Sequence, residues 1–237
     1  MMKHDLELGQ HFMTDKKLLK EIVSQARITD EDVVLEIGSG SGNLTRELLK
    51  KTNNLICIEK DDRYGPLNDK IKYYSEDALK KITELKFNKV VANIPYHISE
   101  PLLKQLLSKK PSKIVLVTGK QFAEKLLSKT KIGIITRETY SIEQLKTIQP
   151  SSFEPAPKVK SSLLVLNRKE IPGILNDFFE YSKTKTKNYL IKKRLKNKKE
   201  TKLLASEISF SEKKLYELST EEVDELKQLL EGIIVKE

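Results

Sequence analysis

The sequence contains little that could cross-link the chain or anchor it in a membrane. Cys57 is the only cysteine among 237 residues, which excludes an internal disulfide and leaves no group of thiols for zinc. No uninterrupted apolar run approaches the roughly 18 residues of a membrane span, and the first residues, MMKHDLELGQHFM, lack the apolar stretch of a signal peptide. We therefore expect a cytoplasmic protein with no membrane segment and no metal site.

Positive charge is concentrated in one segment near the carboxyl end. The chain carries a formal charge of +10, and residues 183–202 hold ten Lys or Arg and one acid, a net +9. Such a block is typical of a protein that binds a polyanion, because each neutralised phosphate releases a condensed counterion. The alternative is a solvated helix face. The candidate phosphate-binding residues are Lys183, Lys185, Lys187, Lys192, Lys193, Arg194 and Lys196.

Strand and helix patterns alternate over roughly residues 30–130. Strands are predicted for DVVLEIG, which looks buried, and for NLICIEK, residues 70–75, NKVVANI and SKIVLVTGK, with helices at NLTRELLKK, EPLLKQLLSKK and QFAEKLLSK. Asp15 is a plausible N-cap for an earlier helix. This alternation predicts a doubly wound α/β sheet of parallel strands, a class that binds ligands beyond the carboxyl ends of its strands.

The second half of the chain predicts a change of structural class. The stretch KIGIITRETYS fits either a strand or a helix, whereas EQLKTIQP and SSLLVLNRK look like two strands joined by the loop PSSFEPAPKVK. From Ile171 onward only helical patterns remain, and Ser219 and Glu222 have the spacing of a capping box. We therefore predict a catalytic α/β domain over residues 1–168 and a small basic helical domain over residues 169–237.

A glycine-rich turn and two acids indicate a nucleoside cofactor. Gly38, Gly40 and Gly42 follow a predicted strand and precede a predicted helix, so a ligand could approach their backbone closely. Glu59 ends the next strand, where a carboxylate can accept hydrogen bonds from both hydroxyls of a ribose. Asp77 follows the third strand and could meet an adenine amino group. The alternative for Glu59 is an exposed acid at a strand end.

The stretch NIPY predicts a site for an exocyclic amine. The Asn93 side-chain oxygen and the Ile94 carbonyl, turned outward by Pro95, would form two acceptors at a strand end, and an amine such as that of adenine has two N–H donors. Tyr96 could stack on the base. The two acceptors would favour a more tetrahedral nitrogen with its lone pair directed at an electrophile. The alternative for Asn93 is an amide that caps a turn.

Four motifs together resemble one known family. GQHFMTD, EIGSGSGNLT, NIPYHIS and FEPAPKVKSS occur in the order and spacing seen in the ribosomal RNA adenine N6-dimethyltransferases, and the resemblance covers nearly the whole chain. That family includes a KsgA type acting on small-subunit RNA and an Erm type acting on large-subunit RNA. The resemblance implies a class I, Rossmann-like methyltransferase fold with S-adenosylmethionine as cofactor.

The resemblance also implies roles for individual residues. It places at the cofactor Gln10, His11, Met13, Gly38, Gly40, Gly42, Glu59, Lys60, Asp77, Ala78 and Asn93. It places at the target adenine Asn93, Ile94, Pro95, Tyr96 and Phe153, with the Tyr96 and Phe153 rings sandwiching the extruded base. Family members commonly have Asn and Leu at the positions of His11 and Met13, and His11 could replace that asparagine as a hydrogen-bonding group.

The choice between the two branches rests on finer features. The chain length is close to that of the Erm type, but NIPYHISEPLLKQLL and FSEKKLYELSTEEVDELKQLL look more like the small-subunit type. We expect a monomer that dimethylates N6 of two adjacent adenosines near the 3′ end of small-subunit rRNA in a pre-ribosomal particle, with a role in ribosome biogenesis. The alternatives are an Erm-type enzyme, an RNA-binding assembly factor in which methylation is secondary, and a DNA adenine methyltransferase, which the motif order disfavours.

Overall fold

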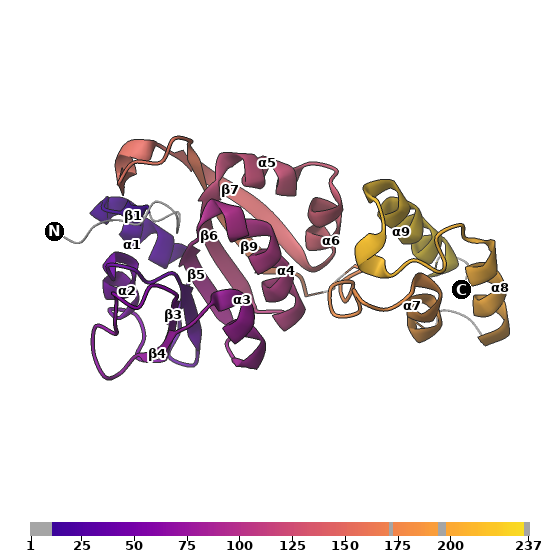
Figure 1. Ribbon diagram of the computed structural model, residues 1–237, viewed down its shortest axis with the longest axis horizontal. Helices are drawn as coiled ribbons and strands as arrows, with labels where there is room; N and C mark the ends of the chain where they lie inside the picture. The colour runs from indigo at the N-terminus through magenta and orange to yellow at the C-terminus, as the bar shows by residue number, and fades with distance from the viewer. Residues whose placement is uncertain (1–10, 171–172, 194–197, 235–237) are drawn as a thin grey trace. The chain divides into compact units, whose positions relative to one another are not determined.

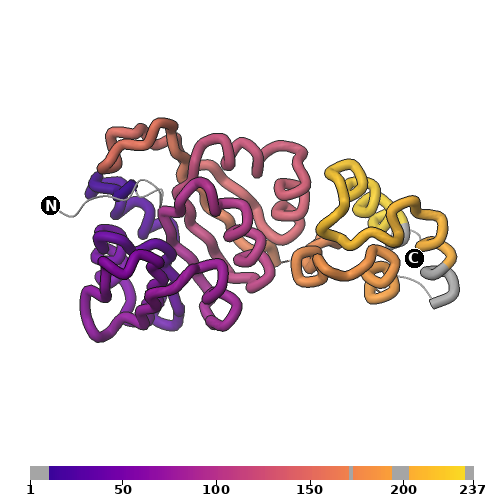
Figure 2. The backbone as a smooth tube through the Cα atoms, viewed as in Figure 1, coloured from indigo at the N-terminus to yellow at the C-terminus, as the bar shows by residue number. Residues whose placement is uncertain are grey.

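The computed structural model describes residues 11–170, 173–193 and 198–234 of the chain. The chain divides into two compact units. The first unit contains the chain up to Glu124 and the segment Tyr140–Arg168, and the second contains Lys125–Thr139 and Lys169–Glu237. Figure 2 traces the course of the backbone, coloured by residue number.

In the described residues, a seven-stranded sheet forms the centre of the first unit (Figure 1). Its strand order is β4 (Lys72–Ser75), β3 (Leu55–Glu59), β2 (Val34–Ile37), β5 (Lys89–Asn93), β6 (Lys113–Gly119), β9 (Ser161–Arg168) and β7 (Tyr140–Ile148). The strands from β4 to β6 are parallel, whereas β9 is antiparallel to both of its neighbours. The predicted doubly wound α/β class is confirmed, and its topological switch point lies between β2 and β5.

The central strands are apolar because other elements cover both faces of the sheet. Every residue of β2 and β3 is buried. Helices α1 (Lys16–Gln25) and α2 (Asn43–Leu48) pack on one face, where Ile22 and Leu48 join Val34 in one apolar cluster. The unit also contains α3 (Ala78–Lys81), η1 (Ile82–Glu84), η2 (Tyr96–Ile98), α4 (Ser99–Lys109), most of α5 (Lys120–Leu127) and η3 (Pro150–Ser152).

The N-cap predicted at Asp15 is confirmed. The carboxylate of Asp15 accepts hydrogen bonds from the backbone N–H groups of Lys17 and Leu18, at 2.9 and 3.1 Å. These bonds satisfy two of the N–H groups that the first turn of a helix leaves without intrahelical partners. Helix α1 therefore begins directly after the segment that carries His11.

A pair of short strands joins the amino-terminal segment to the proline-rich loop. Strand β1 (Phe12–Met13) pairs antiparallel with β8 (Phe153–Glu154), so that Met13 lies opposite Phe153. The predicted strands on either side of that loop are β7 and β9, which pair antiparallel as expected. Phe12 and Met13 of the motif GQHFMTD are thereby held against a loop that comes much later in the chain.

The sequence leaves helix and strand open for the segment KIGIITRETYS. In the structure, most of the segment is helix and its end is strand. It forms α6 (Lys131–Thr139), and only its last residues enter β7, which begins at Tyr140. Ile134 and Ile135 are buried in the apolar cluster of the second unit. The Lys131 ammonium donates hydrogen bonds to the carbonyl of Leu218, at 2.6 Å, and to others nearby. Tertiary packing against helices therefore decides the conformation of this segment.

The described part of the second unit is helical. With α6 it contains α7 (Thr186–Lys193), α8 (Lys198–Glu207), η4 (Leu215–Glu217) and α9 (Thr220–Ile234), around a core that includes Phe178, Phe210 and Leu226. The predicted capping box is confirmed, because Ser219 and Glu222 each accept a hydrogen bond from the backbone N–H of the other, at 3.2 and 2.8 Å. Among the helices that the structure describes, none is long and apolar enough to cross a membrane.

The boundary between the units differs from the predicted division after residue 168. The prediction assigns residues 125–139 to the catalytic domain, whereas their contacts place Lys125–Thr139 in the second unit. The buried face of α6 packs in the helical cluster, and Glu138 forms an ion pair with Lys227 of α9 at 3.0 Å. The predicted division assumes that each unit is one continuous segment. It therefore misses the assignment of Lys125–Thr139 to the second unit.

The core of the second unit gives a test of its packing. Replacing Leu226 with Ala removes a fully buried side chain and should lower the free energy of unfolding by about 2–5 kcal/mol. Leu203→Ala is the matched control, because Leu203 is 64% exposed and its loss should change stability by less than about 0.5 kcal/mol. The chain has no tryptophan, so urea unfolding is followed by the helical circular dichroism signal. Equal losses in the two variants would contradict this core.

Candidate active site

The glycine-rich turn between β2 and α2 is shaped by backbone torsions that few other residues adopt. Gly38, Gly40 and Gly42 all have positive φ angles, of 74°, 46° and 78°. A Cβ atom built on Gly40 would overlap the ring of Phe12, and one on Gly38 would come 3.6 Å from the Asn93 carbonyl oxygen. The backbone conformation therefore favours glycine at all three positions, space also requires it at Gly40, and the turn lies beside the end of β5.

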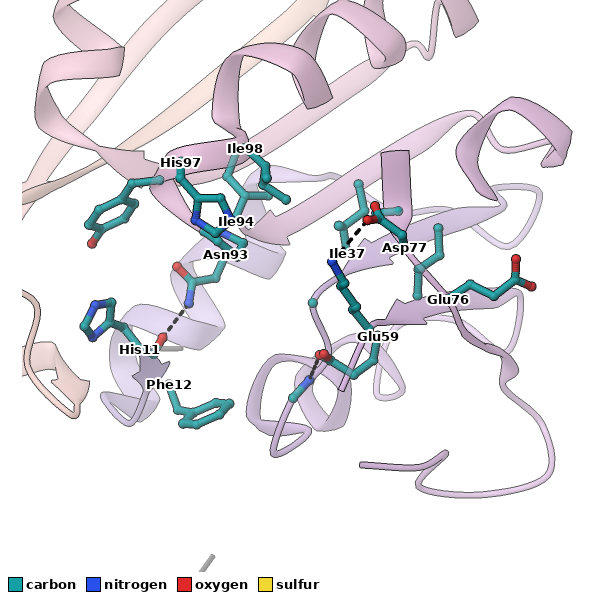
Figure 3. A pocket seen from close by; sticks show the side chains of 17 residues that line it. His11, Phe12, Ile37, Glu59, Glu76, Asp77, Asn93, Ile94, His97 and Ile98 are labelled. Atoms are coloured by element: carbon teal, nitrogen blue, oxygen red, sulfur yellow. Dashed lines mark hydrogen bonds and ion pairs between the residues drawn. The ribbon is translucent and has the colours of Figure 1, made fainter. Parts of the chain in front are cut away.

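Glu59 ends β3 and braces this turn. Its Oε2 accepts a hydrogen bond from the Gly40 N–H at 2.8 Å, and its Oε1 accepts one from the Asp61 N–H at 2.9 Å. The side chain is buried yet lines the pocket, as Figure 3 shows. A carboxylate has about four lone-pair sites, so two of them remain able to accept hydrogen bonds from a ligand's hydroxyl groups.

Asp77 caps α3 beside a lysine. Its Oδ1 accepts a hydrogen bond from the Leu79 N–H at 2.9 Å, and its Oδ2 lies 3.3 Å from the Lys60 ammonium. Burial alone would raise the pKa of Asp77, but the Leu79 and Lys60 hydrogen bonds outweigh burial and hold the pKa below its usual value. Asp77 is therefore an anionic acceptor at the pocket wall, with Ala78 next to it.

The end of β5 presents an oriented amide. The Asn93 Nδ2 donates a hydrogen bond to the His11 carbonyl at 2.9 Å, which leaves the side-chain oxygen as the group that can accept (Figure 3). Among the described residues, none donates to this oxygen or to the Ile94 carbonyl, whereas the Ile94 N–H is paired with Val117. Pro95 follows with φ −57° and ψ 133° and ends the strand. The two predicted acceptors are therefore adjacent.

The ring of Tyr96 is fixed at both of its ends. Its hydroxyl shares a hydrogen bond with the Ser161 hydroxyl at 2.6 Å. Near the backbone, Gly119 lies against the ring, because a Cβ on Gly119 would be only 3.3 Å from the Tyr96 Cγ. Burial raises the pKa of the Tyr96 hydroxyl, which keeps the side chain neutral at physiological pH. Tyr96 therefore offers a flat, uncharged surface at a defined position.

These groups line one pocket, with about 920 Å³ of empty space that includes open solvent. In Figure 3, Glu59, Glu76 and Asp77 lie on one side, and His11, Asn93 and His97 lie on the other. The structure brings together most of the predicted cofactor and target residues, namely His11, Gly38, Gly40, Glu59, Lys60, Asp77, Ala78, Asn93, Ile94, Pro95 and Tyr96. Their parallel strands end at the same edge of the sheet.

Other predicted site residues do not line this pocket. Phe153 is only 4% exposed and belongs to the apolar core with Met13, so neither side chain reaches the pocket wall. Gly42 lies outside the pocket as the N-cap of α2. Gln10 falls outside the described residues. The expected sandwich of a base between Tyr96 and Phe153 is thus not formed by the side chains as they lie here.

Sequence reasoning missed several lining residues. Phe12 covers Gly40, and Ile37, Ile58, Glu76 and Ile98 complete the walls. Ile37 is the last residue of β2 and Ile58 the next-to-last residue of β3, and their places near the ends of predicted strands are a signal that could have identified them. No sequence pattern identifies Phe12 as a lining residue, because its position beside the pocket depends on the pairing of β1 with β8.

Ion pairs engage several of the predicted phosphate-binding lysines. Lys185 and Lys187 both contact the single carboxylate of Glu212, the former at 2.8 Å, and their hydrogen bonds lower the pKa of Glu212 to about 2. Lys193 pairs with Asp177 at 2.7 Å. The positive charge of this segment is therefore partly compensated by acids from elsewhere in the second unit.

The remaining basic residues differ in their surroundings. The Lys192 ammonium lies 3.9 Å from the centre of the Tyr181 ring, a cation–π arrangement that leaves the charge accessible. Lys183 is exposed. Arg194 and Lys196 lie outside the described residues. In the described part of the chain, no group of three or more His, Cys, Asp or Glu residues is placed to hold a metal ion.

Glu36 is a carboxyl group buried beneath the glycine turn. It is fully enclosed in the middle of β2, where its Oε2 accepts a hydrogen bond from the Cys57 thiol, at 3.4 Å between oxygen and sulfur. Its Oε1 has no hydrogen-bond partner among the described residues. Burial, together with the nearby Glu59 carboxylate, raises the pKa of Glu36 to about 7. This group therefore changes charge near neutral pH inside the core.

The raised pKa predicts a dependence of stability on pH. The unfolded carboxyl loses its proton near pH 4.5 and the folded one near pH 7, so stability falls as pH rises between these values. Since one pKa unit corresponds to about 1.4 kcal/mol, the loss by pH 8 is on the order of 3 kcal/mol. The Glu36→Gln variant should not show this loss when the free energy of unfolding is measured in urea at pH 5 and at pH 8.

The exposed carboxyl of Glu143 on β7 gives a matched control. Glu143→Gln makes the same chemical change in the first unit, and it should leave the pH dependence of the wild-type protein unchanged. If Glu36→Gln loses as much stability as the wild type between pH 5 and pH 8, Glu36 is not the group responsible.

The sequence of this chain is similar to sequences of one known protein family. Residues 1–230 match the family described as "Ribosomal RNA adenine dimethylase". The probable ribosomal RNA small subunit methyltransferase A of Methanococcus vannielii is 31% identical over 262 aligned positions, which cover 97% of each chain. The protein of the same name from Methanococcus aeolicus is 34% identical, and the alignment covers 97% of this chain and 90% of that one.

Solved structures agree with this assignment. A dimethyladenosine transferase from Plasmodium falciparum is similar with a TM-score of 0.67 and 26% identity, over 94% of this chain and 98% of that one. The 23S rRNA methyltransferase ErmE has a TM-score of 0.62 over 93% of this chain and 99% of that one, and at 22% identity the likeness shows the fold alone. This chain belongs to the ribosomal RNA adenine dimethylase family, whose enzymes depend on S-adenosylmethionine.

Proposed function

We propose that this protein dimethylates N6 of two adjacent adenosines near the 3′ end of small-subunit rRNA. The observation that carries the proposal is the pair of neighbouring acceptors at the end of β5, the Asn93 side-chain oxygen and the Ile94 carbonyl, whose residues line one pocket with the glycine turn and Glu59. The relatives named as small subunit methyltransferases, which align over almost the whole chain, support the choice of RNA.

The pocket fits S-adenosylmethionine in several respects. The Gly38–Gly40 turn exposes backbone where a side chain would fill the space, and the Glu59 carboxylate keeps acceptor sites suited to ribose hydroxyls. Asp77, held anionic by Leu79 and Lys60, would accept from an adenine amino group. When bound, the cofactor supplies an electrophilic methyl group. The residues of the first unit must then present the target nitrogen to it.

Asn93 and Ile94 would hold the target amine by its two N–H groups. The bond from Asn93 Nδ2 to the His11 carbonyl prevents the amide from presenting its nitrogen instead. As the target nitrogen becomes tetrahedral and gains positive charge, both acceptors bind it more strongly, which stabilises the transition state more than the ground state. No side-chain base is needed, because the alkylated nitrogen is acidic and its proton can pass to water.

The same acceptors allow a second transfer. After one methylation the amine keeps one N–H, and either acceptor oxygen can bind it. Tyr96, fixed by Ser161 and Gly119, would keep the base in the plane that aims its nitrogen into the pocket. Stacking of a base on one aromatic ring contributes about 1–3 kcal/mol. Positioning by Asn93, Ile94 and Tyr96 is therefore the main catalytic contribution of the chain itself.

The second unit would bind rRNA phosphates within a pre-ribosomal particle, to which the protein would attach as a monomer. Lys183 and Lys192 are exposed on this unit, and Lys185 and Lys187 would add to them when phosphate replaces Glu212 as their partner. Contacts with phosphate position a protein without reading the RNA sequence. The choice of adenosine would then depend on the pocket and on the shape of the particle.

Asn93→Ala tests the amine site directly. It removes the acceptor oxygen, so the rate of methyl transfer should fall at least about 100-fold, as for other single preorganised polar groups in active sites. The measurement uses labelled S-adenosylmethionine and small subunits from cells lacking the modification, with the nucleosides identified by mass spectrometry. Large subunits, offered in parallel, should receive no label.

Two outcomes would contradict the proposed function. Wild-type protein that forms no dimethyladenosine on small subunits would exclude the reaction. Dimethyladenosine formed by Asn93→Ala at the wild-type rate would exclude the proposed role of the amide. Leu203→Ala, which changes an exposed side chain of the second unit, should retain wild-type transfer and controls for handling.

Glu212→Gln tests the phosphate-binding surface. The substitution removes the carboxylate shared by Lys185 and Lys187, so both ammonium groups become available to phosphate and the affinity for small subunits should rise. The slope of log affinity against log salt should steepen by about 1.4–1.8 if each ammonium group gains one phosphate. Binding is measured by cosedimentation at several salt concentrations.

The control for Glu212→Gln is a second variant that also loses one negative charge. Glu225→Gln removes an exposed carboxylate from α9, and it should raise affinity less, since it frees no lysine pair. Equal effects of Glu212→Gln and Glu225→Gln would mean that only net charge matters. That result would remove the support for a defined surface around Lys185.

A further inference from the structure

One aromatic side chain of the second unit lies mostly in solvent. Tyr216 of η4 is 54% exposed, whereas Leu215 and Leu218 on either side of it are buried in the core of this unit. Among the described residues, the other large apolar side chains that are exposed are all aliphatic. An aromatic ring that the fold leaves in solvent is accessible to a ligand.

The backbone holds this ring in a defined place. The Tyr216 N–H donates a hydrogen bond to the Ser182 carbonyl at 3.0 Å, and the Tyr216 carbonyl accepts one from the Lys131 ammonium at 2.8 Å. A hydrogen bond to the Glu217 carboxylate raises the pKa of the Tyr216 hydroxyl, so the ring is uncharged at physiological pH. Tyr216 is therefore a positioned, neutral, flat surface.

Lysines from two separate segments gather beside the ring. Lys185 and Lys214 pair in an antiparallel β-bridge, with backbone hydrogen bonds between the two segments on either side of it. The Lys214 ammonium lies 5.8 Å from the centre of the Tyr216 ring. Lys187 lies on the same side as Lys185, because both bind the carboxylate of Glu212. Three cationic side chains thus lie along one surface that ends at the ring.

A single strand of RNA matches this surface. Each nucleotide carries a negative phosphate and a base with a flat face, and proteins that bind single strands combine cationic groups with stacking aromatic rings. In a double helix the faces of the bases are covered by their neighbours, so Tyr216 would find none to stack on. The nearby acids are already engaged, since Glu212 binds two of the lysines and Glu217 accepts from the Lys214 N–H at 2.8 Å.

We propose that Tyr216 stacks on an unpaired base of RNA while Lys185, Lys187 and Lys214 bind the adjacent phosphates. This role rests on the proposed function and deepens it, because it names single-stranded RNA as the part of the particle that the second unit binds. Tyr216 and Lys214 follow the basic segment 183–202 in the chain, and only the pairing of Lys185 with Lys214 joins them to it.

Two labelled probes separate the base from the phosphates. The first is a short single-stranded RNA of uridines, which carry no exocyclic amine for the site of the first unit. The second is the same sugar–phosphate chain without bases. In fluorescence anisotropy with the full chain, Tyr216→Ala should weaken binding of the uridine RNA about 5- to 150-fold, the range for one lost stack, and leave the abasic probe unchanged. Tyr216→Phe keeps the ring and should bind both probes as the wild type does.

A pair of neighbouring lysines tests the phosphate contacts. Lys214→Gln should weaken binding of both probes and reduce the slope of log affinity against log salt by about 0.7, the value for one phosphate of a single strand. Lys213→Gln makes the same change in charge at a lysine that pairs with Glu222 at 2.7 Å, and its effect should be smaller. Equal effects of the two variants would overturn the phosphate contact of Lys214.

Three results would overturn the stacking role of Tyr216. The first is a folded Tyr216→Ala variant, judged by its melting temperature, that binds the uridine RNA as the wild type does. The second is an equal loss of affinity for the uridine and abasic probes. The third is weaker cosedimentation of Tyr216→Ala with small subunits at unchanged affinity for the uridine RNA, which would assign the ring to a protein of the particle.

The binding assay contains no S-adenosylmethionine, so its result is independent of methyl transfer. A wild-type protein that methylates small subunits, together with a Tyr216→Ala variant of unchanged RNA affinity, overturns the role of Tyr216 alone. A wild-type protein that transfers no methyl group but binds the uridine RNA through Tyr216 overturns the proposed reaction alone.

Discussion

The site depends on the parallel register of three strands. Ile37 of β2 pairs with Ile58 of β3 on one side and with Ala92 of β5 on the other, so the next residues, Gly38, Glu59 and Asn93, meet at one edge of the sheet. A shift of one residue in any strand would turn these side chains to the opposite face. The apolar residues buried on both faces oppose such a shift. Packing of the core therefore sets the geometry of the polar pocket.

The hydrogen bond between Asn93 and the His11 carbonyl connects this edge to a distant part of the chain. A partly buried amide must pair its polar atoms, and this bond satisfies the nitrogen while leaving the oxygen for a ligand. His11 can reach Asn93 because β1 pairs with β8 and thereby brings the amino-terminal segment to the pocket. The orientation of one side chain thus depends on three separate segments of the first unit.

Acidic residues elsewhere in the second unit neutralise part of the positive charge of residues 183–202. Residues 183–202 carry a net +9, yet Glu212 binds two of their lysines and Asp177 binds a third. The two pairs with Glu212 are exposed and contribute little to stability, so a phosphate could replace this carboxylate at small cost, whereas the Asp177 pair is largely buried. By pairing with these lysines, the acids reduce the attraction of the second unit to any polyanion.

The sequence by itself determined the main order of strands and helices, the glycine turn, the acid at the end of β3, the acid after β4, and the predicted acceptors at Asn93 and Ile94, because these follow from local patterns of polarity and turn residues. Only the tertiary structure decided that residues 131–139 form a helix of the second unit, that Phe153 lies in the core, and that the His11 ring faces Tyr96. Each of these depends on contacts between segments far apart in the chain, which no local pattern records.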